Sequence, residues 1–323
     1  MIDRTIVQKQ IPKTLERTDL GMGERVEGKV RDNYLTGDGR RFIVVTDRLS
    51  AFDRVITTLP FKGQVLNRAA AFWFDLTRDQ VPNHMLRVPD PCVMEVTECA
   101  IFPVEMVVRS YLTGVTSTAI WTHYSRGKRV FCGHKLPDGL KKNEPLPGPI
   151  LTPSTKAAHG GHDISAAREE LLDMGVITAK DFDALASLSM TLFSIGQAHC
   201  AKNGVILVDT KYEFGRTPDG RIVVADEVHT PDSSRFWLAE TYEARLRKGE
   251  EPEGFDKEYV RRWLADQGFT GDGRIPHIPD DVRVEAAMRY ILALEKITGL
   301  PFEPDTVDPL PRIRRNLSSS RPG

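Results

Sequence analysis

Hydrophobic and polar residues alternate along two neighbouring runs of the chain, Val205–Phe214 and Arg221–Val228. Both runs are rich in β-branched and aromatic residues, and the turn sequence Thr217-Pro218-Asp219-Gly220 lies between them. This pattern is typical of antiparallel strands that are joined by a tight turn. We therefore predict a β-hairpin in which Pro218 and Asp219 are the two turn residues.

Weaker patterns predict the other elements. Residues 1–110 alternate short strands with turns. The expected strands include Phe42–Arg48 and Val104–Val108, and the expected helices are Gln64–Asp75, Ser117–Ser125, Asp163–Asp173, Ala179–Asn203 and Asp281–Thr298. We also expect a surface loop over the proline- and glycine-rich stretch Gly133–Pro153, and a polar, frayed tail from Arg312 to the end.

The first run of the hairpin carries an unusual set of charges. Asp209, Lys211 and Glu213 occupy every second position, so their side chains share one face of the strand. The expected turn places Lys211 opposite Asp226, with Glu213 and Asp226 as diagonal neighbours about 7–8 Å apart. A solvated outer face is one interpretation. We favour a site for a cation or a charged ligand, because Asp226–Arg235 adds further carboxylate, hydroxyl and guanidinium groups.

The composition narrows the class of protein. The 323 residues are 40% hydrophobic and 28% charged, with a formal net charge of −1. These values are ordinary for a globular protein and give no field that attracts nucleic acid or an anionic membrane. The length suits two packed lobes. The sequence has neither a membrane-spanning apolar run nor a signal peptide, and its four cysteines show no CxxC spacing. We expect a cytoplasmic protein.

Two segments in the first third of the chain carry groups that suit a nucleotide. In Gly28–Asp32, the glycine lets the backbone approach a phosphate, and Lys29 and Arg31 aim two cations the same way. The alternative is an exposed basic strand end. The apolar strand that ends at Arg109 can offer its backbone to a purine between two lobes, or can be an ordinary core strand.

Two later segments precede expected helices. The turn Ser110–Ser117 is either an anion site or a plain N-cap. Lys156 and the pair His162-Asp163 supply ligand-type groups, although the histidine can be an ordinary surface residue and the aspartate an N-cap. No zinc-type spacing is present, so a metal would be bound by oxygen ligands, and Mg²⁺ is the first candidate.

Seven motifs between Gly28 and Arg235 occur in an order that resembles the SAICAR synthetase (phosphoribosylaminoimidazole-succinocarboxamide synthase) family. They are GKVRDNY, VVTDRLSAFD, KGQVLN, VEMVVRSYLTG, LTPSTKA with a following HD, VDTKYEFG and DEVHTPDSSR. A weaker echo, DKEYVR, spans residues 256–261. The last two motifs together are highly specific, whereas the short motifs alone are not.

The resemblance implies an α+β fold of two lobes, with a nucleotide cleft between them as in protein kinases and ATP-grasp enzymes. The antiparallel-sheet-rich N-terminal lobe (1–110) would contain the glycine-bearing phosphate loop, and the mixed α/β C-terminal lobe (111–323) would carry the metal and substrate sites. The implied reaction uses ATP and Mg²⁺ to ligate L-aspartate to carboxyaminoimidazole ribonucleotide (CAIR) through an acyl phosphate in purine synthesis. These small molecules are the expected partners, and assembly into a homo-oligomer stays open.

The resemblance also implies residue roles. Lys211, Asp209 and Asp163 match catalytic positions; Lys29, Arg31, Glu105, Met106, Val107 and Lys156 match nucleotide-binding positions; Arg109, Ser117, Ser234, Arg235 and Arg261 match substrate-binding positions; Glu213 and Asp226 match the carboxylates for Mg²⁺. Within the nucleotide set, residues 105–107 correspond to an adenine hinge. Val115 stands where many family members have a serine, so a phosphate contact there would pass to Thr116, Ser117 or the backbone.

Three rival functions are weaker. A kinase-like small-molecule phosphotransferase would use the same carboxylates, but the sequence has no His-Arg-Asp or Asp-Phe-Gly motif. A sensor without chemistry would be expected to have lost some of Lys29, Lys211, Glu213 and Asp226, and all four are present. An RNA-binding module conflicts with the charge near zero.

Overall fold

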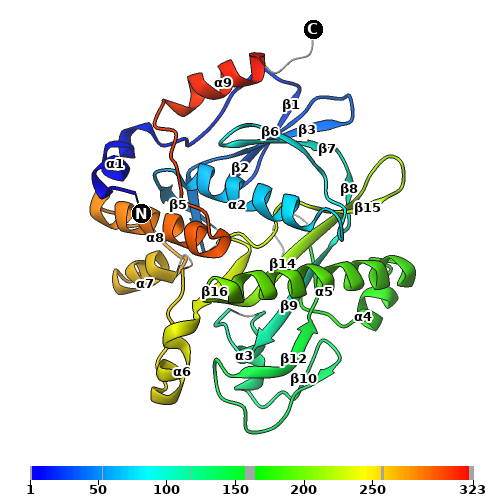
Figure 1. The fold of residues 1–323 in the computed structure, drawn as a ribbon. Helices are drawn as coiled ribbons and strands as arrows, with labels where there is room; N and C mark the ends of the chain where they lie inside the picture. The colour runs from blue at the N-terminus through cyan, green and yellow to red at the C-terminus, as the bar shows by residue number, and fades with distance from the viewer. Residues whose placement is uncertain (1, 53, 117, 157–163, 256–257, 320–323) are drawn as a thin grey trace.

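The computed structural model describes residues 2–52, 54–116, 118–156, 164–255 and 258–319, which form a mixed α+β fold with antiparallel sheets (Figure 1). Along the first sheet the strands are β1 (Glu24–Glu27), β2 (Arg31–Leu35), β3 (Arg40–Val45), β7 (Val93–Thr97) and β6 (Met85–Asp90), in that spatial order. The apolar run Phe42–Val45 in β3 is buried, as predicted, but the strand ends before Asp47. The backbone N–H of Gly63 donates to the Asp47 carboxylate at 2.8 Å, so Asp47 helps to fix the start of a helix.

The second sheet has β9 (Val104–Tyr111) and β14 (Val205–Arg216) at its centre. Strands β12 (Pro145–Leu151) and β13 (Ser154–Thr155) pair with β9, whereas β15 (Ile222–Ala225), β16 (Ser234–Leu238) and β8 (Ala100–Ile101) pair with β14. Two separate pairs are β4 (Arg48–Ala51) with β5 (Arg54–Thr58), and β10 (Val130–Phe131) with β11 (His134–Lys135). The long strand β14 therefore joins most of the second sheet.

The described helices include three that the sequence pattern predicts closely. The helices are α1 (Arg4–Lys9), α2 (Lys62–Thr77), α3 (Ile120–Tyr124), α4 (Arg168–Asp173), α5 (Ala179–Lys202), α6 (Ala239–Lys248), α7 (Glu258–Asp266), α8 (Asp280–Thr298) and α9 (Pro309–Ser319), with a short 3-10 turn at Ile11–Lys13. The predictions for α2, α5 and α8 are confirmed. Helices α3 and α4 begin later than predicted, and α1, α6, α7 and α9 were not predicted.

Packing joins the two sheets into one core. Helix α5 packs against β9 and β14, and α2 packs against β3 and α8. Buried residues recur every three or four positions along α5, at Leu185, Ser189, Leu192, Gly196 and Cys200, as expected for a helix with one face on a sheet. One continuous apolar cluster contains Val45 of the first sheet and Phe214 of the second. The hydrophobic effect therefore holds the sheets together as well as forming each of them.

Two predictions of irregular structure are wrong. Strands β11 and β12 lie inside the predicted loop, and β12 pairs with β9 through backbone groups that a side-chain pattern does not reveal. The tail forms α9 as far as Ser319, because Ile313 and Leu317 are buried and Arg312 donates to the Asp90 carboxylate at 3.0 and 3.1 Å. An arginine with only 1% of its surface exposed can be held there because the aspartate neutralises it.

The chain order and the packing differ from the predicted division at residue 110. That boundary falls inside β9, whereas the first sheet ends at Thr97. Helices α8 and α9 return to the first half of the chain, where they pack against α2 and β6. Figure 1 shows α9 beside the first sheet. None of the described helices is long and apolar enough to cross a membrane.

The close approach of α2 to β3 gives a stability prediction. A Cβ at Gly63 would lie 2.3 Å from the backbone oxygen of Val45, and neither backbone can move cheaply. Gly63→Ala is expected to lower the free energy of unfolding by about 1–3 kcal/mol, measured by urea denaturation. Gly148→Ala is the matched control, because nothing lies within 4 Å of a Cβ there. Equal midpoints for the two variants would contradict the packing argument.

A buried histidine gives a pH prediction. His229 is fully buried, its Nε2 lies 2.5 Å from the Tyr212 hydroxyl, and Trp73 packs on it with ring centroids 4.6 Å apart. Burial lowers the pKa of His229 to about 3. Below the ordinary pKa of about 6.5, the unfolded chain therefore binds a proton that the folded chain does not.

The free energy of unfolding should consequently fall as the pH falls from about 6.5 towards 3, with a contribution from His229 of up to about 1.4 kcal/mol per pH unit. In His229→Gln this part of the slope should disappear, whatever the absolute stability of the variant. Urea denaturation at several pH values measures it. An unchanged slope would show that His229 is already charged in the folded protein.

Candidate functional site

A cavity of about 150 Å³ lies between the two sheets, and we call it the inter-sheet cavity. Strands of both sheets line it. Its apolar wall includes Ile43, Val96 and Ile101, and its polar groups include Arg41, His84, Lys156, Glu213 and Asp226. A cavity lined by both apolar and charged side chains suits a ligand that has a flat ring and an anionic group.

The hairpin that supplies the two carboxylates forms, but its predicted register is wrong. Glu213 pairs with Ala225, and Arg216 pairs with Ile222, one residue away from the expected alignment. The turn holds three residues instead of two, since the Thr217 N–H donates to the Arg221 carbonyl and Gly220 has a φ of +88°. A glycine in this conformation at the end of a three-residue turn is a common hairpin connection.

Asp226 still reaches the cavity of Glu213. In the observed register an extended chain would direct Asp226 to the opposite face of the sheet from Ala225 and Glu213. Instead, Asp226 follows β15 with a φ of 64°, a left-handed conformation that is uncommon for residues other than glycine. The chain turns there, and both carboxylates line the inter-sheet cavity. The expected convergence is present for a different geometric reason.

Lysines neutralise Glu213 from two sides. Lys211 donates to Glu213 at 2.6 Å and to Glu105 at 2.8 Å, and Lys156 forms an ion pair with the other oxygen of Glu213. Burial acts to lower the pKa of Lys211, but Glu213 and Glu105 outweigh it, so the pKa lies above its ordinary value. Lys211 is therefore charged at neutral pH, as the sequence interpretation requires.

Arg31 neutralises Asp226. One guanidinium nitrogen pairs with the Asp226 carboxylate, and another lies 2.5 Å from the carboxylate of Glu227. Burial opposes ionisation of Asp226, but Arg31 and then Lys211 outweigh it and lower the pKa of Asp226 to about 2. Arg31 was expected to contact phosphate, and the structure places it on an expected metal ligand instead.

The glycine-containing segment forms a tight turn between β1 and β2. The Gly28 N–H donates to the Arg31 carbonyl at 2.8 Å, and Lys29 lies at the exposed tip. Arg48 supports the turn from below, because it donates to the carbonyls of Gly28 and Lys29 at 3.0 Å each and to the Asp32 carboxylate at 2.9 Å. Asp32 of the motif GKVRDNY and Arg48 of the motif VVTDRLSAFD therefore support the conformation of this turn.

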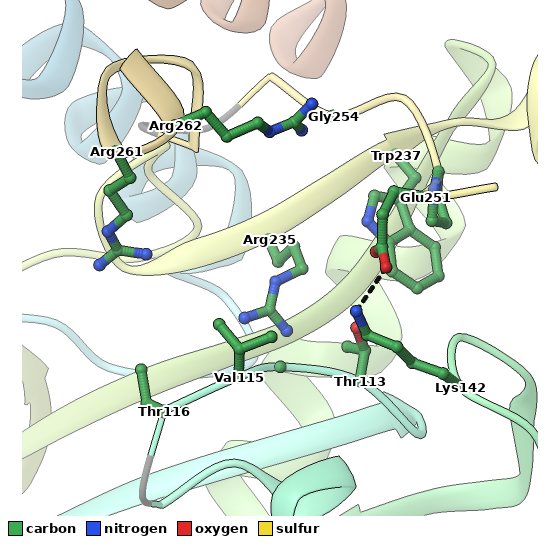
Figure 2. A pocket seen from close by; sticks show the side chains of 12 residues that line it. Thr113, Val115, Thr116, Lys142, Arg235, Trp237, Glu251, Gly254, Arg261 and Arg262 are labelled. Carbon is green, nitrogen blue, oxygen red and sulfur yellow. Dashed lines mark hydrogen bonds and ion pairs between the residues drawn. The ribbon is translucent and has the colours of Figure 1, made fainter. Parts of the chain in front are cut away.

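A second cavity of about 330 Å³ lies at the other end of β14, and we call it the arginine cavity. Its lining includes Arg235 of β16, Arg261 and Arg262 of α7, Lys142, and the turn Thr113–Thr116. Figure 2 shows Arg235 between Val115 on one side and the two arginines of α7 on the other. Among the described residues, four cations and one acid, Glu251, line the cavity, so it suits an anion.

Asp209 connects this cavity to the sheet. The register places Asp209 between Arg109 and Arg235, and its carboxylate lies 2.6 Å from Arg235 and 3.6 Å from Arg109. Next to it, the hydroxyls of Thr210 and Ser234 are 2.7 Å apart. The predicted catalytic residue Asp209 and the predicted substrate residues Arg109 and Arg235 therefore form one cluster, whereas Ser234 pairs with Thr210 at the next position of the ladder.

The predicted adenine hinge at Glu105, Met106 and Val107 does not fit the structure. Met106 and Val107 pair with Tyr212 and Lys211 of β14, Glu105 pairs with Ser154 of β13, and the Val107 carbonyl accepts the Thr152 N–H at 2.7 Å. Backbone groups inside a sheet are already satisfied and cannot bind a base. Ser117 and Asp163, two other predicted site residues, lie outside the described residues.

Several lining residues were missed. Arg262 directly follows the DKEYVR echo, so the doubled arginine of α7 was a usable signal, whereas Lys142 lies in the predicted surface loop and outside every motif. The segment that joins the two sheets, Thr97–Ile101, was also missed; Arg41 holds its Glu98 by hydrogen bonds of 2.6 and 2.7 Å. Because the segment has no motif of its own, only the fold reveals that it borders the inter-sheet cavity.

The chain is similar to known proteins in sequence and in fold. The family model for SAICAR synthetase matches residues 24–276. A phosphoribosylaminoimidazole-succinocarboxamide synthase of Legionella pneumophila is 46% identical over 92% of this chain and 94% of the relative. The structure of SAICAR synthase from Saccharomyces cerevisiae complexed with SAICAR superposes with a TM-score of 0.78 at 30% identity, over 90% of this chain and all of that one. A type-2 SAICAR synthetase in complex with ADP has the same fold, with a TM-score of 0.66 at 24% identity over 87% of this chain and all of that one.

Proposed function

The chain belongs to the SAICAR synthetase family, and from this premise we propose how its two cavities divide the work of the reaction. The enzyme ligates L-aspartate to the carboxylate of CAIR, with ATP as the energy source, and produces SAICAR, ADP and phosphate. The observation that carries the assignment to these residues is β14 itself. Asp209, Lys211 and Glu213 alternate along this strand. Asp209 contacts Arg235 of the arginine cavity, and Glu213 lines the inter-sheet cavity.

ATP is assigned to the inter-sheet cavity, between an N-terminal and a C-terminal lobe as in kinases and ATP-grasp enzymes. The first sheet would form the N-terminal lobe, and Thr97–Ile101 would be the connection that faces the base. Ile43, Val96 and Ile101 supply apolar surface for a purine. Lys29 on the glycine turn and Lys156 would contact the phosphates.

The carboxylates fit a Mg²⁺ ion that arrives with the nucleotide. No cluster of three potential metal ligands occurs within the described parts of the chain, but Glu213 and Asp226 line one cavity. Mg²⁺ is commonly bound by one or two carboxylates together with substrate phosphates. Glu213 and Asp226 would hold it there, and it would neutralise charge on the transferring phosphoryl group.

CAIR is assigned to the arginine cavity. The 5′-phosphate would bind Arg235 and Arg261, with Thr116 or the backbone in place of the family serine at Val115. Arg109, Asp209 and Ser234 would contact the sugar and imidazole. Successive positions along β14 rise by about 3.3 Å per residue, so Asp209 and Glu213 lie about 13 Å apart along the strand. A nucleotide anchored at one end would therefore present its carboxylate near Lys211.

The chemistry then requires two displacements. A carboxylate oxygen of CAIR attacks the γ-phosphorus of ATP, and ADP leaves; the aspartate amine attacks the resulting acyl phosphate, loses a proton, and phosphate leaves. Lys211 would orient the carboxylate, and Lys156 would stabilise the phosphoryl oxygens. Burial between the sheets would exclude water from the acyl phosphate. Asp163 is our candidate for contact with aspartate.

An omission assay tests the function directly. ADP release should require CAIR and aspartate together for sustained turnover, and SAICAR should form in equal amount. A kinase-like phosphotransferase would release ADP without consuming aspartate. That outcome would replace the ligase by the alternative.

Asp226→Asn tests the metal site. The variant should lose about 10²–10³-fold or more in kcat, because a preorganised charge at the transferring phosphoryl group is removed. Its urea denaturation should stay cooperative, and Mn²⁺–ATP binding followed by electron paramagnetic resonance should weaken. Asp219→Asn, in the exposed hairpin turn, is the control and should behave as wild type. Near-normal kcat for Asp226→Asn at ordinary Mg²⁺ would remove Asp226 from the metal site.

Arg235→Ala tests the substrate assignment. Loss of a charge-assisted hydrogen bond to phosphate should raise KM for CAIR by about 10–100-fold. KM for ATP should change little, because Arg235 lines the arginine cavity and not the inter-sheet cavity. Steady-state kinetics with each substrate varied in turn gives both values. An effect confined to KM for ATP would reverse the two assignments.

A further inference from the structure

The described lining of the arginine cavity has one acid among four cations, and this acid already has partners. Glu251 forms an ion pair with Lys142 through Oε1, drawn as the dashed line in Figure 2. Its other oxygen accepts a hydrogen bond from Nδ2 of Asn143 at 3.1 Å. Both side chains of the ion pair line the cavity, and 28% of Lys142 and 56% of Glu251 is exposed.

Asn143 fixes the segment that presents Lys142. Its carbonyl accepts a hydrogen bond from the Tyr242 hydroxyl at 2.8 Å, and its side-chain oxygen accepts one from the Thr113 hydroxyl at 2.6 Å. The Asn143 N–H also donates to the Leu112 carbonyl at 2.7 Å. The backbone is therefore anchored to the end of β9, beside the turn that lines the cavity, while the Lys142 side chain projects from this anchor.

An exposed ion pair of this kind is worth little by itself, because solvent screens both charges. A phosphate monoester carries nearly two negative charges at neutral pH and three acceptor oxygens, whereas Glu251 carries one charge. A phosphate that enters the cavity thus attracts Lys142 more strongly than Glu251 does. Lysine binds phosphate well as a mobile point charge on a flexible stem.

We propose that Lys142 is a further ligand for the phosphate of the substrate, and that Glu251 holds this lysine at the cavity until the phosphate arrives and replaces it. This inference rests on the assignment of the CAIR phosphate to the arginine cavity. It gives a role to the loop that carries Lys142, a residue that lies outside every motif in the sequence. It also explains why one acid lies in an anion site: Glu251 keeps Lys142 ordered in the absence of substrate.

Two variants should act in opposite directions. Lys142→Met should raise KM for CAIR by about tenfold, because one charge-assisted contact is lost. Glu251→Gln should lower KM for CAIR by about threefold, because Lys142 and Arg262 no longer share their charge with a competing carboxylate. kcat and KM for ATP should stay unchanged in both. Lys141→Met is the matched control, since the Lys141 side chain is exposed and does not line the cavity.

Binding of ribose 5-phosphate, measured by isothermal titration calorimetry, separates this inference from the proposed function. If the wild-type protein shows no aspartate-dependent ADP release, the ligase assignment fails, but the titration still reports whether phosphate competes with Glu251 for Lys142. If the wild-type enzyme is active and Lys142→Met leaves both KM for CAIR and the titration unchanged, Lys142 is not a phosphate ligand. If Glu251→Gln weakens binding, Glu251 contacts the substrate itself and the exchange is overturned.

Discussion

The structure depends on the neutralisation of buried carboxylates at the junction of the two sheets. The side chain of Glu213 is 11% exposed and that of Asp226 28%, so an unpaired charge at either position would lose part of its hydration, which is unfavourable. Lys211 and Lys156 neutralise the first, and Arg31 neutralises the second. Since Arg31 belongs to the first sheet and Asp226 follows a strand of the second, the same ion pair also connects the two halves. Removal of Arg31 would break the ion pair of Asp226, whereas Glu213 would keep one lysine after removal of the other.

This arrangement prepares the site for a ligand that carries both signs of charge. In the protein alone, the cations occupy the carboxylates. A nucleotide with its metal ion would bring phosphates that can pair with the cations and a positive ion that can pair with the carboxylates. Each protein charge would then exchange its present partner for one of opposite sign on the ligand. The arginine cavity follows the same principle on a smaller scale, with Glu251 on Lys142. The carboxylates of the inter-sheet cavity are neutralised before a ligand binds, whereas the described lining of the arginine cavity keeps an excess of positive charge.

The sequence predicts the parts of the fold that side-chain periodicity determines. Long amphipathic stretches such as α5 appear in the pattern, and so does the hairpin of β14 and β15. Backbone conformation is less visible. The three-residue turn that includes Gly220 shifts the register by one residue. The left-handed conformation of Asp226 then keeps the two carboxylates at the same cavity. The prediction of an adenine hinge at residues 105–107 is wrong, because a core strand and a ligand-binding strand can have the same composition. Helix α9 was missed because the partner that allows Arg312 to be buried, Asp90, is 222 residues away.

The register of β14 explains why the site tolerates these differences. Alternation along a strand places Asp209, Lys211 and Glu213 on one face whatever partner lies opposite, because the two-residue period belongs to the strand itself. Only the approach of the neighbours depends on register: Arg109 and Arg235 flank Asp209 in the pairings observed. A one-residue slip of β16 would turn Arg235 to the other face, whereas the order of the three β14 charges would survive. The sequence therefore determines that Asp209, Lys211 and Glu213 share one face, and the sheet determines which cations meet them.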